Sequence, residues 1–264
     1  MFKEVFEALR KNEKEFIYNA LEIENSGELS NSAYRFWFND LRQNHLLREG
    51  DIYEFGVYRG SSLLAIALLA KRLDSKKHIW GFDSFEGFPR FSEKDNLSNF
   101  SETNGFDKEQ IEDAHLLAKI RLSNKNIDSK NINSTLSELG KSGLFKKTSY
   151  KMLLNKIEEL SLTNITLIKG DFKDTLEKHF LKKNRKIFSA NVDCDLYEGY
   201  KKCLPIIFKY LEVGGFVNLD EYYSLKYPGA KIATDEFLLK NKNAVLSSSA
   251  TRKGEFPRFY LSKK

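Results

Sequence analysis

Four carboxylates are predicted to lie at the ends of two neighbouring strands, where they would face one pocket. Asp193 and Asp195 fall at the end of the fourth predicted strand, and Asp220 and Glu221 fall at the end of the fifth. Acids this close repel one another unless a cation neutralises them, and oxygen-only ligands favour Mg²⁺ over zinc. We predict Mg²⁺, or another divalent cation, held by Asp193, Asp220 and Glu221. The alternatives are that Asp195 replaces one of these ligands, or that some of the acids serve only as helix caps.

A glycine turn between a strand and a helix is the second feature that points to chemistry. The pattern Glu54-x-Gly56-x-x-x-Gly60 follows an apolar approach and precedes an uninterrupted helical run, 61–73. Ligands of α/β folds gather where strand ends meet helix starts. The dinucleotide pattern G-x-G-x-x-G is absent, and an acid before the first glycine suits a cofactor that carries an ammonium group. S-adenosylmethionine is the common cofactor of that kind; a purely structural turn is the alternative.

Cofactor contacts can be assigned to residues at the strand ends. The backbone of the Gly56–Gly60 turn would meet the methionine moiety, and Glu54 would support that turn or the ammonium group. Asp83, at the tip of the second predicted strand, would accept hydrogen bonds from both ribose hydroxyls. Phe85 would lie against the adenine.

The predicted metal implies a reaction at a hydroxyl group. A divalent cation would bind the acceptor hydroxyl, lower its pKa and hold it for in-line attack on the methyl group. A general base should stand close to that hydroxyl. Asp193 or Asp195 is the first candidate for the base, and His115 is the second; the other three histidines look structural.

Strands and helices alternate regularly after residue 50, which predicts an α/β fold. We expect a Rossmann-like class I methyltransferase architecture, with a seven-stranded, mostly parallel sheet, helices on both faces and a closing hairpin. The predicted strands are 51–58, 78–83, 165–172, 187–196, 216–222, 245–249 and 258–262.

The chain divides into a helical cap, 1–48, and a cofactor-binding domain, 49–264. The cap contains two amphipathic helices, which would cover an active-site mouth, a partner subunit in a homo-oligomer, or a face of the sheet. An insertion at about 90–148 is polar, with one predicted helix at 108–122. So long a polar segment inside a compact domain predicts a lid over the substrate, or partial disorder.

Composition excludes several classes of protein. The chain has 264 residues, of which 41% are hydrophobic and 30% charged, and this is typical of a globular protein. The net charge of +6 comes from scattered lysines without a basic, aromatic-rich stripe, so we expect no nucleic-acid partner. No apolar run is long enough for membrane insertion. Cys194 and Cys203 fit neither a redox pair nor a zinc spacing, and we expect a cytoplasmic protein.

Five short motifs, in order at successive strand tips, resemble the macrocin O-methyltransferase family of metal-dependent sugar methyltransferases. The resemblance covers most of residues 50–240. The motifs are 54–60, 81–89, 170–176, 193–197 and 214–222. The chain has Asp220-Glu221-Tyr222 where the family has Asp-Asp-Tyr, and the insertion matches poorly.

This resemblance implies an S-adenosylmethionine-dependent O-methyltransferase. The acceptor would be a sugar hydroxyl, on a nucleotide-linked sugar used for a surface polysaccharide or a glycosylated natural product. The matching motif implies that Asp171 accepts a hydrogen bond from the adenine amino group. The implied cofactor-binding set is Glu54, Gly56, Tyr58, Arg59, Gly60, Ser61, Ser62, Asp83, Ser84, Phe85, Gly170, Asp171, Phe172 and Asp193.

The sequence is also compatible with two other functions. A methyltransferase of the same fold acting on a catechol-like or other small hydroxylated acceptor is the first, since a metal-bridged diol suits both. A nucleotide-sugar dehydrogenase or a nucleic-acid-binding Rossmann protein is the second. The missing G-x-G-x-x-G pattern and the missing Tyr-x-x-x-Lys pair count against a dehydrogenase.

Overall fold

A computed structural model of the chain describes residues 34–89, 91–123, 148–181, 185–249 and 257–264. The first predicted helix of the N-terminal cap lies outside these residues, as does segment 124–147 of the insertion. Within the described ranges, no helix is both long and apolar enough to cross a membrane.

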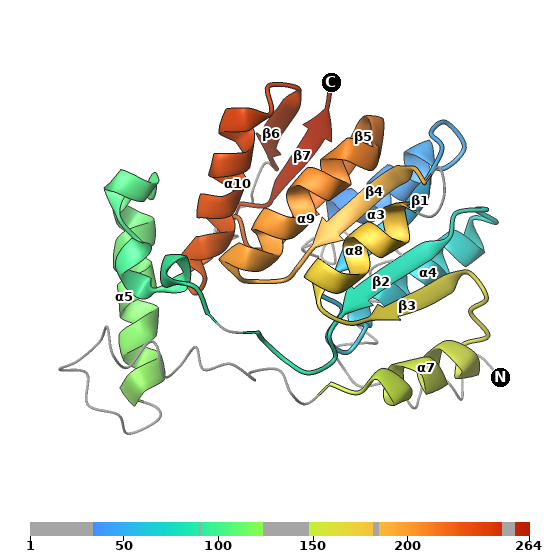
Figure 1. The fold of residues 1–264 in the computed structure, drawn as a ribbon, viewed down its shortest axis with the longest axis horizontal. Coiled ribbons are helices and arrows are strands. Elements are labelled where there is room, and N and C mark those ends of the chain that lie inside the picture. The colour runs from blue at the N-terminus through green and yellow to red at the C-terminus, as the bar shows by residue number, and fades with distance from the viewer. Residues whose placement is uncertain (1–33, 90, 124–147, 182–184, 250–256) are drawn as a thin grey trace, which may run out of the picture.

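A single seven-stranded sheet forms the centre of the molecule (Figure 1). Its order is β3-β2-β1-β4-β5-β7-β6, and β7 runs in the direction opposite to the other six strands. The predicted fold class is thereby confirmed. The strands are β1 Asp51–Phe55, β2 Ile79–Asp83, β3 Ile165–Lys169, β4 Ile187–Val192, β5 Leu211–Leu219, β6 Ala244–Ser248 and β7 Phe259–Lys263.

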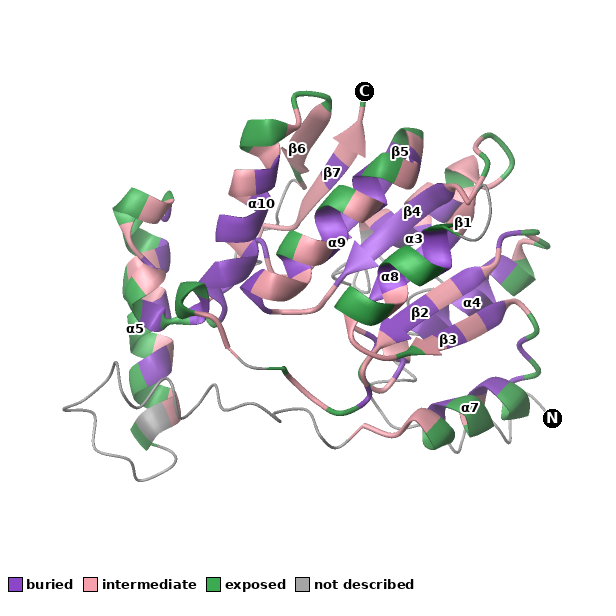
Figure 2. Ribbon diagram, viewed as in Figure 1, coloured by how far each residue is buried: buried purple, intermediate pink, exposed green. Residues whose placement is uncertain are grey.

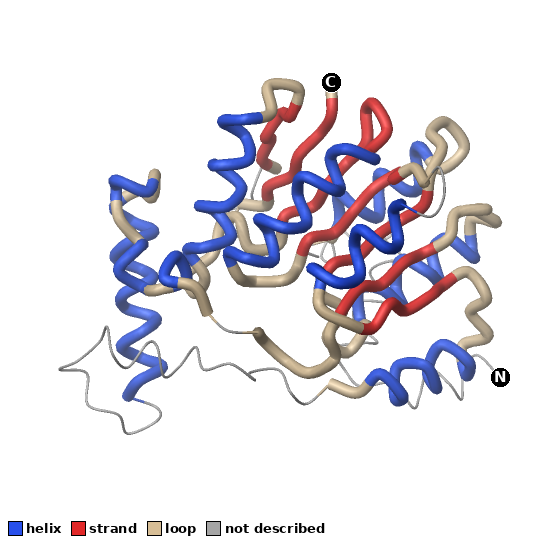
Figure 3. The backbone as a smooth tube through the Cα atoms, in the orientation of Figure 1, coloured by secondary structure: helices blue, strands red, loops and turns tan. Residues whose placement is uncertain are grey.

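Helices cover both faces of the sheet (Figure 3). One apolar core lies between the sheet and α8, α9 and α10, and a second lies between the sheet and α3, α4 and α7. Figure 2 shows β4 buried along its length, as expected of a central parallel strand. The helices are α3 Arg35–Asn44, α4 Ser61–Arg72, α5 Lys108–Ser123, α7 Tyr150–Glu159, α8 Phe172–Leu181, α9 Tyr197–Tyr210 and α10 Pro228–Lys240.

The fifth strand begins earlier than its sequence indicates. Gly214 and Gly215 predict a turn that opens the strand, yet β5 starts at Leu211, directly after α9. Its pairing with β4 jumps from Ile187 opposite Leu211 to Ser189 opposite Phe216. The glycines therefore lie within an irregular stretch of the strand, where the missing side chains permit the bulge.

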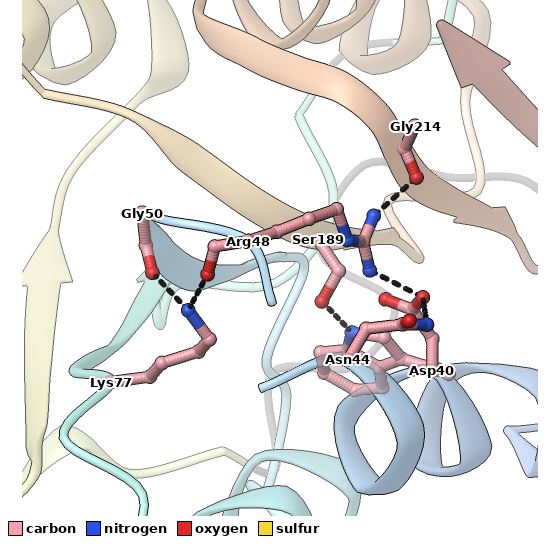
Figure 4. A network of polar contacts seen from close by, with 8 residues as sticks. Asp40, Asn44, Arg48, Gly50, Lys77, Ser189 and Gly214 are labelled. Atoms are coloured by element: carbon pink, nitrogen blue, oxygen red, sulfur yellow. Dashed lines mark hydrogen bonds and ion pairs between the residues drawn. The ribbon is translucent and has the colours of Figure 1, made fainter. Parts of the chain in front are cut away.

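Helix α3 is fastened to one face of the sheet at the end opposite to the strand tips (Figure 4). The Arg48 guanidinium donates to the Asp40 carboxylate and to the Gly214 carbonyl. The Lys77 ammonium donates to the carbonyls of Arg48, at 2.7 Å, and Gly50, at 3.0 Å. Of the three positions considered for the N-terminal helices, α3 occupies the sheet face.

The described part of the insertion contributes to the apolar core. Leu97, Phe100 and Phe106 are buried in the same core as α9 and α10. The Asp95 carboxylate accepts a 2.8 Å hydrogen bond from the backbone N–H of Tyr197, the first residue of α9. Three short 3₁₀ turns, Glu93–Asp95, Leu97–Asn99 and Glu102–Asn104, lead from this contact to α5, which projects from the body (Figure 1).

Candidate active site

A cavity of about 910 Å³ opens at the carboxyl ends of the parallel strands. This is the edge at which ligands bind in open α/β sheets, and the volume falls within the range of cofactor and substrate pockets. The ends of five strands and the segments that follow them line it. The lining residues are Gly56 and Tyr58 at β1, 83–84 and 86–89 at β2, 170–172 at β3, 193–196 at β4, and Glu221, Lys226 and Tyr227 at β5.

The glycine turn brings the ends of β1 and β4 into close contact. Gly56 has a φ of +91°, and a Cβ there would lie 1.9 Å from the Asp193 carbonyl oxygen. Gly60, at the N-cap of α4, has a φ of +82°, and a Cβ would lie 2.4 Å from a methyl group of Leu153. Both positions require glycine. The bare turn leaves backbone next to the cavity, as a closely approaching cofactor needs.

Asp83 holds this turn in place. One carboxylate oxygen, Oδ2, accepts the N–H groups of Val57 and Tyr58, both at 2.8 Å, and Oδ1 accepts the N–H of Phe85 at 2.6 Å. A carboxylate oxygen has two lone pairs, so Oδ1 retains capacity for a further donor. The sequence did not indicate that Asp83 holds the turn. Its contact with a ribose hydroxyl stays a prediction.

Glu54 lies beneath the turn and does not line the cavity. Its side chain is fully buried, and Oε1 accepts hydrogen bonds from the Ser62 hydroxyl at 2.5 Å and the Asn191 amide at 2.8 Å. Asn191 in turn accepts from Asn218 at 2.8 Å, so a polar row crosses three strands. Burial raises the pKa of Glu54 to about 8. The side chain therefore supports the turn and the start of α4.

The four acids predicted at the tips of β4 and β5 influence one another strongly. Burial, and then the charge of Asp220, raise the pKa of Asp193 well above its usual range. Burial, and then Glu221, do the same for Asp195. Burial also raises the pKa of Asp220 and of Glu221. Asp193, Asp195 and Glu221 line the cavity, whereas Asp220 does not.

Two residues that the sequence did not single out contact this acidic cluster. The Tyr34 hydroxyl donates to Asp193 Oδ2 at 2.9 Å. Burial, and then Asp193, raise the pKa of Tyr34, so the hydroxyl keeps the proton that it donates. The Arg258 guanidinium lies 3.7 Å from Asp220 Oδ1. Neither position carries a local sequence pattern that would have identified it.

The predicted metal ligands gather at one edge without forming a ready coordination site. Within the described residues, no three His, Cys, Asp or Glu side chains are arranged to hold a metal ion. The donor set itself is made of carboxylate oxygens, which suit Mg²⁺. Their raised pKa values indicate negative charge that a cation or protons must balance. The chemistry of the side chains fits a divalent cation.

Other predicted site residues fall into two groups. Asp171, Gly170, Phe172, Ser84 and Tyr58 line the cavity, whereas Arg59, Gly60, Ser61 and Ser62 do not.

Phe85 and His115 lie away from the predicted contacts. The Phe85 ring packs against Tyr150 in the core, with ring centroids 5.2 Å apart, and does not line the cavity. His115 is exposed on α5, because Ala114 and Ala118 form the buried face of that helix.

Several cavity residues were missed by the sequence analysis. Phe88 meets Tyr227 edge to face, with centroids 5.8 Å apart, and exposed Lys226 stands beside them at the cavity wall. Lys202 lies 3.7 Å from Asp171 Oδ1. Phe88 belongs to the motif 81–89, although no role was predicted for it; the other residues belong to α9 and to the loop after β5.

Comparison with known proteins gives a consistent result. The profile of a family described as methyltransferase domain matches residues 53–222. Among curated protein sequences, none matches this chain.

Solved structures of an O-methyltransferase and of a calicheamicin methyltransferase are among those similar to this fold. The O-methyltransferase NovP is 21% identical, with a TM-score of 0.57 over 85% of this chain and 75% of its own. The calicheamicin methyltransferase CalS11 is 21% identical, with a TM-score of 0.58 over 96% of this chain and 93% of its own. An apo structure of CalS11, described as a TDP-rhamnose 3′-O-methyltransferase, has a TM-score of 0.50. At these identities the likeness establishes the arrangement of the sheet and its helices.

Proposed function

The chain belongs to the methyltransferase domain family, and from this premise we propose that it transfers a methyl group from S-adenosylmethionine to a sugar hydroxyl. The observation that carries the proposal is one cavity in which a bare glycine turn and a cluster of carboxylates meet. The turn suits the cofactor, and the carboxylates suit a hydroxyl that must lose its proton. NovP and CalS11, which share the fold, are an O-methyltransferase and a TDP-rhamnose 3′-O-methyltransferase.

The cofactor would lie across the tips of β1, β2 and β3. Backbone groups at Gly56 and Tyr58 would contact the methionine moiety, and Asp83 Oδ1 would accept from the ribose. Asp171 would accept from the adenine amino group, with its charge balanced by Lys202. Glu54 holds the turn from below.

The reacting end would lie at the tips of β4 and β5. Asp193 and Asp195 line this end, and either carboxylate in its deprotonated form can accept the proton of a hydroxyl placed there. His115 is exposed on α5 and does not line the cavity, so the base is proposed among these two acids. Mg²⁺, bound among Asp193, Asp220 and Glu221, would supply the positive charge that acidifies the acceptor hydroxyl. Cavity walls orient the acceptor for in-line attack on the methyl group.

The finer parts of this proposal follow the resemblance to the macrocin O-methyltransferase family. They are a nucleotide-linked sugar as acceptor, a product used in a surface polysaccharide or a glycosylated natural product, and metal dependence. A cytoplasmic location is proposed from the composition and the cysteine spacing, and self-association from the amphipathic pattern of the N-terminal helices.

One observation favours a second acceptor class. The Phe88 and Tyr227 rings meet edge to face at the cavity wall. Such a pair also suits a flat, catechol-like acceptor, which can pack against aromatic rings.

An acceptor screen tests the proposal. Purified protein is incubated with S-adenosylmethionine labelled at the methyl group and with a panel of nucleotide sugars, beginning with TDP-rhamnose, and of catechols. We expect label in a sugar product. Label only in catechols would establish the second class, and binding of NAD in preference to S-adenosylhomocysteine would overturn both.

A further inference from the structure

Tyr34 reaches the acidic end of the cavity from outside the family-matched segment. Its hydroxyl lies 2.9 Å from Asp193 Oδ2, whereas the family match begins at residue 53. The Tyr34 side chain is 5% exposed, so little water competes for the bond. Asp193 lines the cavity. The phenol is thus a buried donor to a carboxylate at the reacting end.

Packing holds the phenol firmly. The Tyr34 ring lies 6.2 Å from the Trp37 ring and 6.3 Å from the Phe38 ring, and all three residues are buried. The Trp37 indole N–H donates to the Ser189 hydroxyl at 3.0 Å. Ser189 lies within β4 and Asp193 directly follows that strand, so two hydrogen bonds join the α3 segment to one strand.

A carboxylate in this cluster needs a fixed donor. Asp193 is close to Asp220, Asp195 and Glu221, whose charges repel it. The Asp193 side chain also has a hydrogen bond with the Asp220 side chain. Without Tyr34, that bond alone would set the orientation of the Asp193 carboxyl group. A neutral donor at the start of a packed helix fixes the second contact without adding a mobile charge.

We propose that Tyr34 is a positioning residue for Asp193, holding the carboxylate in one orientation at the reacting end through the bond to Oδ2. This inference rests on the proposed function, because it takes Asp193 as a residue of the reacting end. It adds a segment outside the matched domain to the site. A protein cut to the matched residues would lack this donor.

A double-mutant cycle tests whether the bond acts in solution. Tyr34→Phe keeps the ring and removes the hydroxyl. The unfolding equilibrium constant should rise about tenfold when Asp193 is present, as expected when a buried acceptor loses its donor. With Asp193→Ala in the same chain, Tyr34→Phe should have little effect. Equal effects in the two backgrounds would overturn the inference.

Ligand binding tests whether the bond positions the carboxylate. Calorimetry with Mn²⁺ as the probe, in the presence of saturating S-adenosylhomocysteine, should show about tenfold weaker Mn²⁺ binding in Tyr34→Phe. S-adenosylhomocysteine affinity should stay within about twofold. The matched control is Trp37→Phe, which removes the other α3 bond to β4. It should lower the melting temperature and leave Mn²⁺ affinity unchanged.

The Trp37→Phe control distinguishes a loss of Asp193 positioning from a general loss of packing around α3. A similar loss of Mn²⁺ affinity in Trp37→Phe, or none in Tyr34→Phe, would mean that the hydroxyl does not orient Asp193. If the wild-type protein binds no Mn²⁺, the metal is removed from the proposed function. Positioning is then tested by turnover: Tyr34→Phe should lower kcat with little change in the KM for S-adenosylmethionine, and an unchanged kcat would overturn the inference.

Discussion

Asp83 and Glu54 are carboxylates beside the same turn, yet they act in different ways. Asp83 is partly exposed and accepts three backbone N–H groups. Glu54 is fully buried, and burial raises its pKa to about 8, so the neutral form is favoured at neutral pH. A neutral carboxyl group is a poor partner for an ammonium group. The acid of the glycine motif therefore acts through the backbone it supports.

Replacing Asp83 should affect both the turn and the cofactor. Asp83→Ala leaves three N–H groups without their acceptor, and we expect S-adenosylhomocysteine to bind more weakly by about 1–3 kcal/mol. Calorimetry and thermal unfolding measure the two effects. Asp174→Ala, at an exposed position on α8, is the control and should change neither by more than a few tenths of a kcal/mol. Unchanged affinity in Asp83→Ala would exclude Asp83 from the cofactor site.

Metal dependence can be separated from cofactor binding. The glycine turn and Asp83 belong to other strands than the acidic cluster, so chelation should abolish turnover and leave S-adenosylhomocysteine affinity largely intact. Asp220→Asn should reduce turnover on the order of a hundredfold, because a ligand and the acidification of the hydroxyl are lost. Full turnover in excess chelator, with Asp220→Asn near wild type, would show that the acids only orient the acceptor.

At the scale of elements, the insertion and α9 are stabilised by one contact. Helix α9 lacks a capping side chain of its own, and Asp95 of the insertion supplies the acceptor for Tyr197 N–H. The same carboxylate accepts from the Ser92 backbone and hydroxyl, both at 2.9 Å. Because α9 begins directly after the Asp193–Leu196 segment, this cap also fixes one end of the acidic loop.

Removing the cap should reduce both stability and turnover. Asp95→Ala should destabilise the protein by about 1–2 kcal/mol, the usual effect of losing an N-cap acceptor. Ser149→Ala removes the cap of α7, which is remote from the acidic loop, and serves as the matched control. Denaturant unfolding should show losses in both variants, but only Asp95→Ala should lower turnover. Equal turnover in the two variants would contradict a link between the insertion and the acidic loop.

Helix α8 places a neutral histidine among aromatic rings. His179 lies 4.6 Å from the Trp80 ring and 5.1 Å from the Phe82 ring, and burial lowers its pKa from 6.5 to about 4. Protonation thus favours the unfolded chain. The contribution of His179 to stability is full above about pH 6.5 and is lost as the pH falls towards about 4.

The histidine should therefore give a measurable pH dependence. Between about pH 7 and about pH 5, the free energy of unfolding should fall by on the order of 2 kcal/mol through this group. His179→Phe should remove that part of the slope, whereas His115→Gln, at an exposed position, should leave it unchanged. Denaturant titrations at a series of pH values measure it. If the free energy of unfolding of His179→Phe changes with pH as it does in the wild type, the pH dependence comes from other groups.

At the scale of the whole molecule, the alternation of elements was predictable because it is local. Apolar runs, glycine turns and helical periods each span few residues, and they correctly identified seven strands and placed Asp83, Asp171 and Asp193 at the cavity. The ends of strands were less predictable. Strand β5 begins at Leu211 because pairing with β4 outweighs the turn preference of two glycines.

Contacts between distant segments were not predictable from the sequence. Tyr34 and Arg258 contact Asp193 and Asp220 although each is distant from its partner in the sequence, and neither stands in a pattern of its own. Asn, Ser and Lys dominate the insertion, yet a few aromatic residues such as Phe100 and Phe106 pack its first part into the core. The average composition of a segment does not reveal a few buried aromatic residues of this kind. A lid over the substrate stays a prediction.

The position of β7 also constrains the order in which the molecule can fold. Strand β6 pairs with β7 alone, and β7 pairs on its other side with β5. During synthesis, β6 emerges first and has no partner in the sheet until β7 follows it. The β5 edge stays open over the same interval, and an open edge can pair with another chain. The sheet is therefore completed late, and Arg258 arrives beside Asp220 in the same step. A nascent chain acquires its full acidic site only after this edge is closed.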